Sequence, residues 1–230
     1  MDYKKVLENE IQPANSEIMA KFDRYYHLLV EWNEKFNLTA ITEENEVYLK
    51  HFIDSIVGSK YIAPNSTIAD IGAGAGFPSI PLKIIRNDIK VDMYDSLGKR
   101  INFLNAVIHE LNLQDITATH TRIEDVAKNC RGKYDFIVAR AVASLPTLLE
   151  YAMPLLKVNG KLIAYKGSNY EEELLASENA LKVLGATVET VDTFTLADSD
   201  NSRAMVIVRL DRPVNKKYPR GQNKPKNNPL

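Results

Sequence analysis

The sequence predicts a doubly wound α/β domain with a mainly parallel, seven-stranded, Rossmann-like sheet, preceded by a helical extension. Three observations predict this fold. Short apolar strands alternate with helices from about residue 61 onward, as in parallel sheets joined by right-handed crossovers. A glycine-rich turn, Gly72 to Gly76, follows the first of these strands, where doubly wound folds bind ligands. The first part of the chain has helical periodicity and no strand pattern.

The composition is that of an ordinary globular protein. The chain has 230 residues, 45% of them hydrophobic and 26% charged, which is enough for one α/β domain and a small addition. Its one cysteine, Cys130, allows no internal disulfide and no thiolate zinc site. The N-terminus has no apolar segment typical of a signal peptide, and no apolar run is long enough to span a bilayer. We therefore expect a cytoplasmic protein that uses neither a membrane nor a metal.

Residues 1–60 are expected to form the helical extension. Ile18, Phe22, Tyr25, Leu29 and Trp32 recur on one face of a helix that Asn15 or Ser16 can cap. Such an aromatic stripe is typical of core packing rather than of a ligand platform. A second helix is expected between residues 47 and 56.

Residues 61–211 are expected to form the α/β domain. Strands are predicted at about 67–71, 89–94, 115–119, 134–138 and 161–165, with two late strands at 186–193 and 203–209. A helix is predicted from Leu145 to Lys157. Ser168 and Glu171 have the spacing of a capping box for the next helix, which Gly185 is expected to end.

Residues 212–230 form a basic, Pro- and Asn-rich tail. Six of the 29 basic residues lie there with no acid, so 23 Lys and Arg face 30 Asp and Glu in residues 1–211, a net charge of −7. Basic tails attract phosphate backbones by releasing counterions. Four prolines are expected to keep the tail extended and off the core, so that its deletion would leave cofactor binding intact. Two alternatives stay open: a solvated, disordered terminus, or docking of Tyr218 and Pro219 on the domain.

The strongest motif runs from Asp70 to Pro78, Asp-Ile-Gly-Ala-Gly-Ala-Gly-Phe-Pro. Its glycines let a ligand approach the backbone at the end of the strand. The spacing is G-x-G-x-G, whereas dinucleotide sites use G-x-G-x-x-G, and Phe77 stands where the third glycine of that fingerprint would be. S-adenosylmethionine has no pyrophosphate and needs only a close turn. The motif therefore favours S-adenosylmethionine over NAD.

Three further features carry candidate chemistry. Asp95 ends the second strand, where an acid can accept hydrogen bonds from ribose hydroxyls. Glu124 or Asp125, after the third strand, could accept the adenine amino group, or could only stabilise a helix N-terminus. Arg140 follows the fourth strand among small apolar residues, which suggests a site role, although an arginine extending from a strand end is the alternative.

Taken together, the sequence closely resembles the small-subunit ribosomal RNA methyltransferase G family, also called glucose-inhibited division protein B. The resemblance covers nearly the whole chain in order, and its motifs are Asn37-Leu38-Thr39-Ala40-Ile41, His51-Phe52-Ile53-Asp54-Ser55, Asp70 to Pro78, Asp95-Ser96-Leu97 with Lys99-Arg100, Ala139-Arg140-Ala141-Val142-Ala143, and Tyr218-Pro219-Arg220.

The resemblance implies a class I methyltransferase that transfers a methyl group from S-adenosylmethionine to N7 of a guanine in small-subunit (16S) ribosomal RNA. It implies cofactor contacts at Gly72, Phe77, Ile123, Glu124 and Arg140, with Ile123 acting through its backbone. We add Gly74 and Asp95 to that set, and keep Arg140 as the one catalytic candidate. The expected partner is this RNA or its assembling particle, bound by a monomer through Lys99, Arg100, Lys166, Lys216, Lys217, Arg220, Lys224 and Lys226.

Two other function classes remain possible from the residues alone. An NAD-dependent oxidoreductase would require the G-x-G-x-x-G spacing, which is missing. A non-catalytic nucleotide- or RNA-binding module would keep the basic tail but would not need the glycine turn together with Asp95. Binding of S-adenosylmethionine but not of NAD would separate the three classes.

Overall fold

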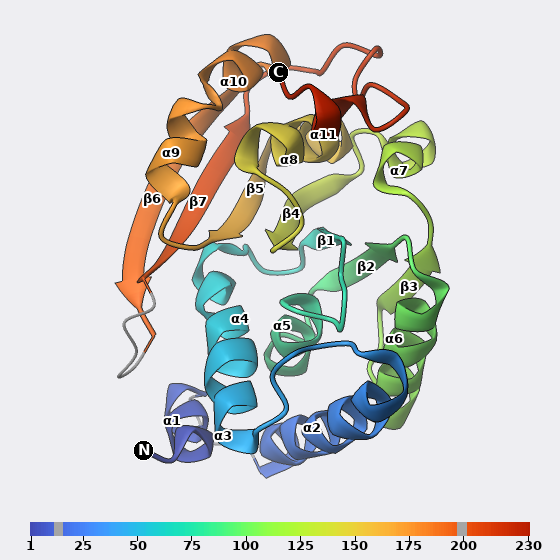
Figure 1. Ribbon diagram of the computed structural model, residues 1–230, viewed down its shortest axis with the longest axis vertical. Coiled ribbons are helices and arrows are strands. Elements are labelled where there is room, and N and C mark those ends of the chain that lie inside the picture. The colour runs from blue at the N-terminus through green and yellow to red at the C-terminus, as the bar shows by residue number, and fades with distance from the viewer. Residues whose placement is uncertain (12–15, 197–201) are drawn as a thin grey trace.

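The computed structural model of the chain describes residues 1–11, 16–196 and 202–230. Its seven-stranded sheet has the order β3-β2-β1-β4-β5-β7-β6 (Figure 1). The first five strands pair in parallel, and β7 pairs antiparallel with both β5 and β6. The predicted doubly wound, mainly parallel sheet is confirmed. The strands are β1 (Thr67–Ile71), β2 (Lys90–Asp95), β3 (Ile116–His120), β4 (Tyr134–Arg140), β5 (Leu156–Lys166), β6 (Ala186–Thr195) and β7 (Ser202–Leu210).

Helices cover both faces of the sheet, because successive residues of each strand point to opposite faces. Ile68 of β1 belongs to a core cluster with residues of α5 and α6, and Ala69 to a second cluster with residues of α7, α8 and α10. The helices in this region are α5 (Ser79–Ile85), α6 (Gly98–Glu110), α7 (Ile123–Cys130), α8 (Leu145–Ala152), the 3-10 segment η3 (Met153–Leu155), α9 (Tyr170–Leu175) and α10 (Glu178–Leu184).

The N-terminal helices pack outside α5 and α6 and share their core (Figure 1). Phe22, Tyr25 and Leu29 of the predicted stripe are buried in the same cluster as Ile68, so the stripe serves packing. The predicted boundary between residues 60 and 61 falls inside a 3-10 segment. The elements are α1 (Tyr3–Glu10), α2 (Ser16–Phe36), α3 (Glu44–Val47), the π-helical η1 (Tyr48–Ile53), α4 (Asp54–Ile56), the 3-10 segment η2 (Val57–Tyr61) and, at the other end of the chain, α11 (Lys224–Asn227). The proposed cap Asn15 lies outside the described residues.

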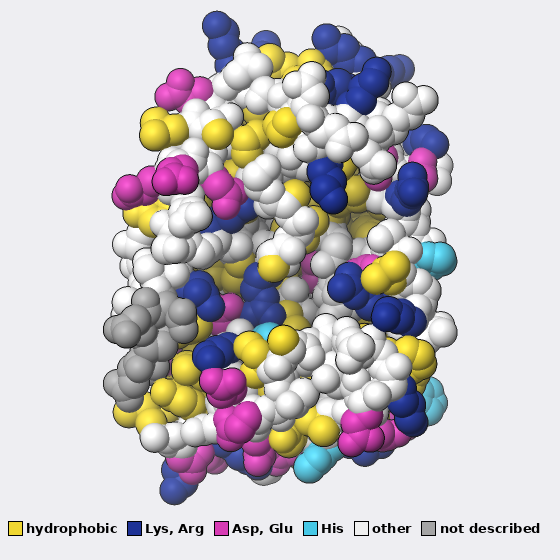
Figure 2. All heavy atoms as spheres, viewed as in Figure 1, with side chains coloured by type: hydrophobic (Ala, Val, Ile, Leu, Met, Phe, Trp, Pro, Cys, Tyr) yellow, Lys and Arg dark blue, Asp and Glu magenta, His cyan; other side chains and the backbone are white. Residues whose placement is uncertain are grey.

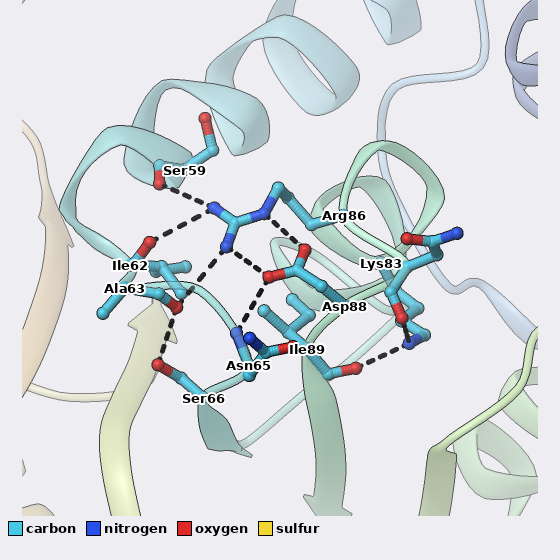
Figure 3. Close-up of polar contacts among 10 residues, drawn as sticks. Ser59, Ile62, Ala63, Asn65, Ser66, Lys83, Arg86, Asp88 and Ile89 are labelled. Atoms are coloured by element: carbon cyan, nitrogen blue, oxygen red, sulfur yellow. Dashed lines mark hydrogen bonds and ion pairs between the residues drawn. The ribbon is translucent and has the colours of Figure 1, made fainter.

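A polar cluster ties the extension to the edge of the sheet where its parallel strands begin (Figure 3). Arg86 donates to both carboxylate oxygens of Asp88, each at 2.7 Å, and to the carbonyl oxygen of Ile62 at 3.2 Å. Asp88 in turn accepts the backbone N–H of Asn65 at 3.0 Å. Nearby, Lys83 Nζ donates to the carbonyl of Ile89 at 2.6 Å. These bonds hold the connection into β1 firmly at the end opposite the glycine turn.

Three local predictions were wrong. The helix predicted to reach Lys157 ends earlier, because Leu156 pairs with Tyr134 and already belongs to β5. The capping box does not form: the Ser168 hydroxyl donates to Asn169, and α9 begins only at Tyr170. The helix expected to run on to Gly185 is also interrupted, since the hydroxyl of Ser177 donates to the carbonyl of Glu173 at 2.6 Å and competes with the helical ladder. Gly185 ends α10 at φ +73°, as predicted.

The basic tail packs against the domain, so the prediction of an extended, free tail was wrong. Tyr218 is buried, and Arg131 donates to its carbonyl oxygen. Arg220 forms an ion pair with Glu150 on α8. The Thr147 hydroxyl donates to the carbonyl of Pro225, itself a buried residue, at 2.9 Å. The alternative in which Tyr218 and Pro219 dock on the domain describes this segment.

Candidate active site

The glycine turn after β1 requires glycine for steric reasons. Gly72, Gly74 and Gly76 have φ values of +78°, +60° and +95°, where a Cβ is unfavourable. A Cβ at Gly72 would lie 2.9 Å from a methyl group of Val142, and one at Gly76 would lie 2.7 Å from the Tyr25 hydroxyl. At Gly74 it would meet only the Gly72 carbonyl oxygen, 3.9 Å away. The turn is therefore tightly packed on both sides of Gly74 and open at Gly74.

A cavity of about 530 Å³, the turn pocket, opens beside this turn at the carboxyl ends of β1, β2 and β3. Four of the predicted cofactor residues line it, namely Gly72, Asp95, Ile123 and Glu124. Gly74 reaches it through a hydrogen bond to Asp95. Phe77 and Arg140 are not among its described lining residues and lie in a neighbouring cluster.

Asp95 is nearly fully buried at the floor of the turn pocket. One carboxylate oxygen accepts the N–H of Gly74 at 2.9 Å and an N–H of Arg100 at 3.2 Å. The other oxygen accepts the N–H of Leu97 at 2.9 Å. Asp95 thus shapes the turn as well as facing the pocket. Arg100, predicted to bind RNA, is engaged in this ion pair.

These features fit S-adenosylmethionine. The turn leaves open space at Gly74, and the buried Asp95 carboxylate, which accepts three hydrogen bonds within the protein, keeps one acceptor site for a ribose hydroxyl. Val142 and Ile123 supply apolar walls, and Glu124 lies at the start of α7. The volume of this cavity is typical of cofactor sites, and its lining combines apolar walls with charged and polar side chains that can bind the polar groups of such a ligand.

A second cavity of about 440 Å³, the Arg140 pocket, lies on the other side of the loop after β4. Arg140 donates to Asp54 Oδ2 at 2.8 Å and to the Lys50 carbonyl at 3.1 Å, and a third N–H points at His51 Nδ1 at 3.3 Å. His51 Nε2 lies 2.9 Å from the Thr39 hydroxyl. Arg140 thus joins the loop after β4 to the segment of residues 50–54, about 90 residues earlier in the chain, and Thr39 contacts that segment through His51.

His51 is held neutral in this pocket. Burial, reinforced by the positive charge of Arg140, lowers the pKa of His51 to about 4. Its ring stacks on Phe77, with centroids 4.4 Å apart, and Arg140 lies over the same Phe77 ring at 5.0 Å. Phe77 therefore supports the Arg140 pocket rather than the turn pocket. Sequence reasoning quoted the His51 motif but missed His51 and Asp54 as site residues, because their contacts with Arg140 span about 90 residues.

Residues 141–143 form a partition between the two pockets. Ala141 lines both, Val142 lines the turn pocket, and Ala143 lines the Arg140 pocket. Ala141 has φ +56°, a strained conformation for a residue with a Cβ. Strain of this kind is common where a loop is held for function. The partition places the turn pocket and the Arg140 pocket next to each other.

Asp70, the last residue but one of β1, is fully buried behind the turn. Neither of its carboxylate oxygens has a hydrogen-bond partner among the described residues. Burial raises the pKa of Asp70 to about 7, against the opposing effects of the neighbouring Ser79 and of the positive charge of Arg140. A carboxylate in this position is poised to change its charge near neutral pH.

The C-terminal segment contributes to the turn pocket, which the sequence did not predict. Asn223 and Lys226 line it. A further cavity of about 600 Å³ adjoins it, sharing Arg122 and Glu124, and includes Lys216, Tyr218 and Pro219 in its wall. The sequence feature that could have indicated this contribution is the motif Tyr218-Pro219-Arg220, because a tail that only supplies positive charge does not need a tyrosine and a proline at fixed positions.

The predicted RNA-binding cations fall into two groups. Four are engaged within the protein: Lys99 with the Phe36 carbonyl at 3.0 Å, Arg100 with Asp95 at 3.2 Å, Lys166 with Glu173 at 2.7 Å, and Arg220 with Glu150 at 2.6 Å. The remaining tail lysines, at positions 216, 217, 224 and 226, are exposed. Figure 2 shows Lys and Arg side chains around the hollow that crosses the middle of this face. The acidic body therefore carries a local concentration of positive charge at its pockets.

Within the described residues, no cluster of three or more His, Cys, Asp and Glu side chains could hold a metal ion. A search of the same residues finds no helix with the length and apolar character to cross a bilayer.

The family model described as rRNA small subunit methyltransferase G matches residues 18–203. The chain belongs to this methyltransferase G family. The ribosomal RNA small subunit methyltransferase G of Staphylococcus epidermidis is 47% identical over 229 residues, covering 98% of this chain and 95% of that protein. The protein of the same name from Halalkalibacterium halodurans is 45% identical over 233 residues, covering 100% of this chain and 98% of that protein.

Solved structures of more distant proteins show the same fold. A SAM-dependent methyltransferase from Aquifex aeolicus superposes with a TM-score of 0.58 at 17% identity, over 75% of this chain and 97% of that one. The ribosomal protein L11 methylase of Lactobacillus delbrueckii subsp. bulgaricus gives 0.54 at 20% identity, over 70% and 78%. The class I methyltransferase fold is thereby confirmed.

Membership of the methyltransferase G family confirms the predicted enzyme class, an S-adenosylmethionine-dependent methyltransferase, and with it the predicted cofactor. The oxidoreductase and the non-catalytic binding module are accordingly set aside.

Proposed function

We propose that this chain transfers the methyl group of S-adenosylmethionine to N7 of a guanine in small-subunit (16S) ribosomal RNA, in the cytoplasm and as a monomer. The single observation that carries the proposal is the pair of pockets that share Ala141. One fits a methyl donor, and the other can receive a base. The names of the relatives support small-subunit ribosomal RNA as the source of that base.

The cofactor is held by residues of the turn pocket in this proposal. Gly72 and Gly74 allow close approach to the backbone, Asp95 accepts from the ribose, and Glu124 faces the adenine. Ile123 contributes through its backbone and apolar wall. When bound, S-adenosylmethionine supplies an electrophilic methyl group on a positively charged sulfur.

The main task left to the protein is to position the guanine against the methyl group. Guanine N7 has an in-plane lone pair and no proton to lose, so the acceptor needs no general base. The protein must hold N7 in line with the methyl group, and such positioning can supply a large part of a rate enhancement. His51 is neutral and bonded to Thr39, which suits a role in holding Arg140 rather than in moving a proton. Arg140 is accordingly a positioning residue, supporting the wall of its pocket through Asp54 and Phe77.

RNA capture is assigned to the cations that stay free for it. Lys216, Lys217, Lys224 and Lys226 lie exposed on the C-terminal segment. Arg100 lines the turn pocket and Lys166 the Arg140 pocket, and Lys99 lies next to Arg100 in α6, although each of the three also has a partner within the protein. Phosphate contacts of this kind fix the register of an RNA without reading its sequence.

The test compares ribosomal RNA from cells with and without the gene. Small-subunit RNA is treated with borohydride and aniline, which cleave the chain at N7-methylguanine, and the breaks are mapped. One site lost without the gene and restored by it is the expected result. Identical cleavage maps would refute the N7 assignment. Adding purified enzyme to either naked RNA or subunits from the deficient cells then shows which form accepts the methyl group.

A further inference from the structure

Lys166 and Glu173 place a hydrogen-bond donor beside an acceptor in the wall of the Arg140 pocket. Lys166 Nζ donates to the Ala143 carbonyl at 2.8 Å and to Glu173 Oε2 at 2.7 Å. An ammonium group has three protons, so one remains without a partner in the described residues. Glu173 Oε2 also accepts the N–H of Leu145 at 2.5 Å. No described residue donates to Glu173 Oε1, so this oxygen keeps its acceptor capacity in a side chain that lines the pocket.

The other carboxylate of the pocket is buried. Asp54 is almost fully buried, with Oδ2 bound by Arg140 at 2.8 Å, while Oδ1 lies 3.4 Å from Arg203 Nε and is enclosed by protein without a hydrogen bond from the described residues. The rings of His51 and Tyr165 line the same cavity, and bases commonly stack on such rings in single-stranded RNA. A phosphate group would be repelled by the Glu173 carboxylate. A base with both donors and acceptors can instead accept a hydrogen bond from Lys166 and donate one to Glu173.

We propose that the Arg140 pocket holds the target guanine, with Lys166 donating to O6 and Glu173 Oε1 accepting from N1–H and the N2 amino group. This assignment rests on the proposed function. The Watson–Crick edge of guanine has O6 next to N1–H and N2–H, the order in which Lys166 and Glu173 can meet it. Adenine has a donor and an acceptor exchanged at these places, so both contacts would be repulsive. Lys166 and Glu173 together therefore favour guanine over adenine in this pocket.

The orientation follows from the order of atoms around the base. N7 lies beside O6, on the side away from N1. Lys166 is bonded to Ala143 in the partition, so a guanine whose O6 meets Lys166 turns its N7 edge toward the partition. The turn pocket lies on the other side of that partition. The contacts that recognise the Watson–Crick edge therefore also orient N7 toward the turn pocket.

The experiment uses the full-length enzyme and the shortest RNA hairpin, around the mapped guanine, that the wild type still methylates. The target position is synthesised as guanine, inosine, adenine or 7-deazaguanine, and binding of each hairpin is measured. Inosine lacks only the N2 amino group, and 7-deazaguanine lacks only N7. The wild type is expected to bind guanine about 10-fold or more tightly than inosine, since a hydrogen bond to a charged group is removed. It should bind 7-deazaguanine as tightly as guanine.

Two variants make the test specific. Glu173→Gln keeps an acceptor for the Leu145 N–H, but its single amide oxygen cannot also accept from N1–H and the N2 amino group of guanine. The preference of this variant for guanine over inosine should therefore fall to within about 2-fold. Glu172→Gln, an exposed neighbour on α9, should keep the wild-type preference. Both should bind S-adenosylmethionine as the wild type does. A wild type that binds all four hairpins alike, or a Glu173→Gln variant that keeps its preference, would overturn the assignment. Neither result touches the cleavage map, on which the proposed function depends separately.

Discussion

Arg220 places its guanidinium against the carboxylate of Glu150, which is fully buried in α8. Nε and an NH2 proton donate at 2.9 and 2.6 Å, and the backbone N–H of Arg220 donates to the same carboxylate at 2.7 Å. The other N–H of the same NH2 group donates to the Asn228 carbonyl at 2.8 Å. This one side chain therefore joins the domain, the middle of the C-terminal segment and its end.

Replacing Arg220 with alanine should lower the free energy of unfolding by about 3 kcal/mol, because a buried carboxylate loses its partner. Urea denaturation of the protein without cofactor measures the change. The double variant Arg220→Met with Glu150→Leu removes both charges and should recover much of the loss. If the single variant unfolds at the wild-type urea concentration, the pair is not what holds the segment.

The charge of the tail could be seen in the sequence, but its location could not. Pattern reasoning assigned its basic residues to solvent because they are dense and interspersed with proline. The partner of Arg220 lies 70 residues away, in the apolar helix Leu145–Ala152. A single acid inside such a helix needs a cation, so Glu150 was the signal that the segment docks. Only the three-dimensional arrangement identifies which of six cations meets it.

Deleting residues 212–230 should weaken S-adenosylmethionine binding as well as RNA binding. The sequence alone predicted no effect on the cofactor, but Asn223 and Lys226 line the turn pocket. Loss of this wall opens the cavity to water. Isothermal titration of the truncated and full-length chains gives the two affinities, and near-ultraviolet circular dichroism establishes whether the shorter chain keeps its packing.

A matched control separates the wall from the charge. Lys217 and Lys224 are exposed and do not line the turn pocket. Changing both to alanine should leave cofactor affinity unchanged and flatten the salt dependence of RNA binding, by about 0.7 in slope for each phosphate group that is no longer neutralised. Equal cofactor affinities in the truncated and full-length chains would show that the segment is not part of the pocket.

The site could be predicted where its residues lie at the ends of predicted strands. Gly72 and Asp95 line the turn pocket because a strand end fixes each position, and both strands belong to one parallel sheet. Arg140 was also selected, and it lines the neighbouring cavity, on the other side of the partition. The residue after it lines both pockets, and the sequence does not show that the loop after β4 divides this space into two cavities. His51 and Asp54 needed the packing of the helical extension, which periodicity identified only as core.

Asp95→Ala should weaken cofactor binding by about 1–3 kcal/mol, the usual cost of leaving polar groups without partners. The structure adds that Gly74 and Leu97 lose their acceptor, so the turn itself should loosen. Asp95→Asn keeps one acceptor oxygen and is expected to lose less. Titration calorimetry of both variants would reveal the ranking, and an unchanged affinity in Asp95→Ala would move the ribose contact elsewhere.

Asp70 should make the stability of the cofactor-free protein depend on pH. Burial raises the pKa of Asp70 from the usual 3.8 to about 7, so the folded state binds a proton that the unfolded state has released. The favourable contribution of this proton to stability is complete below pH 3.8 and is lost as the pH rises through 7.

The variant Asp70→Asn cannot ionise at this position. Relative to the wild type, its free energy of unfolding should therefore improve between pH 4 and pH 8, by on the order of 4 kcal/mol at most. Urea denaturation at pH 5, 6, 7 and 8 gives this difference, and His51 titrates equally in both proteins and cancels from it. A difference that stays constant over this range would mean that Asp70 is already ionised in the folded protein at pH 5.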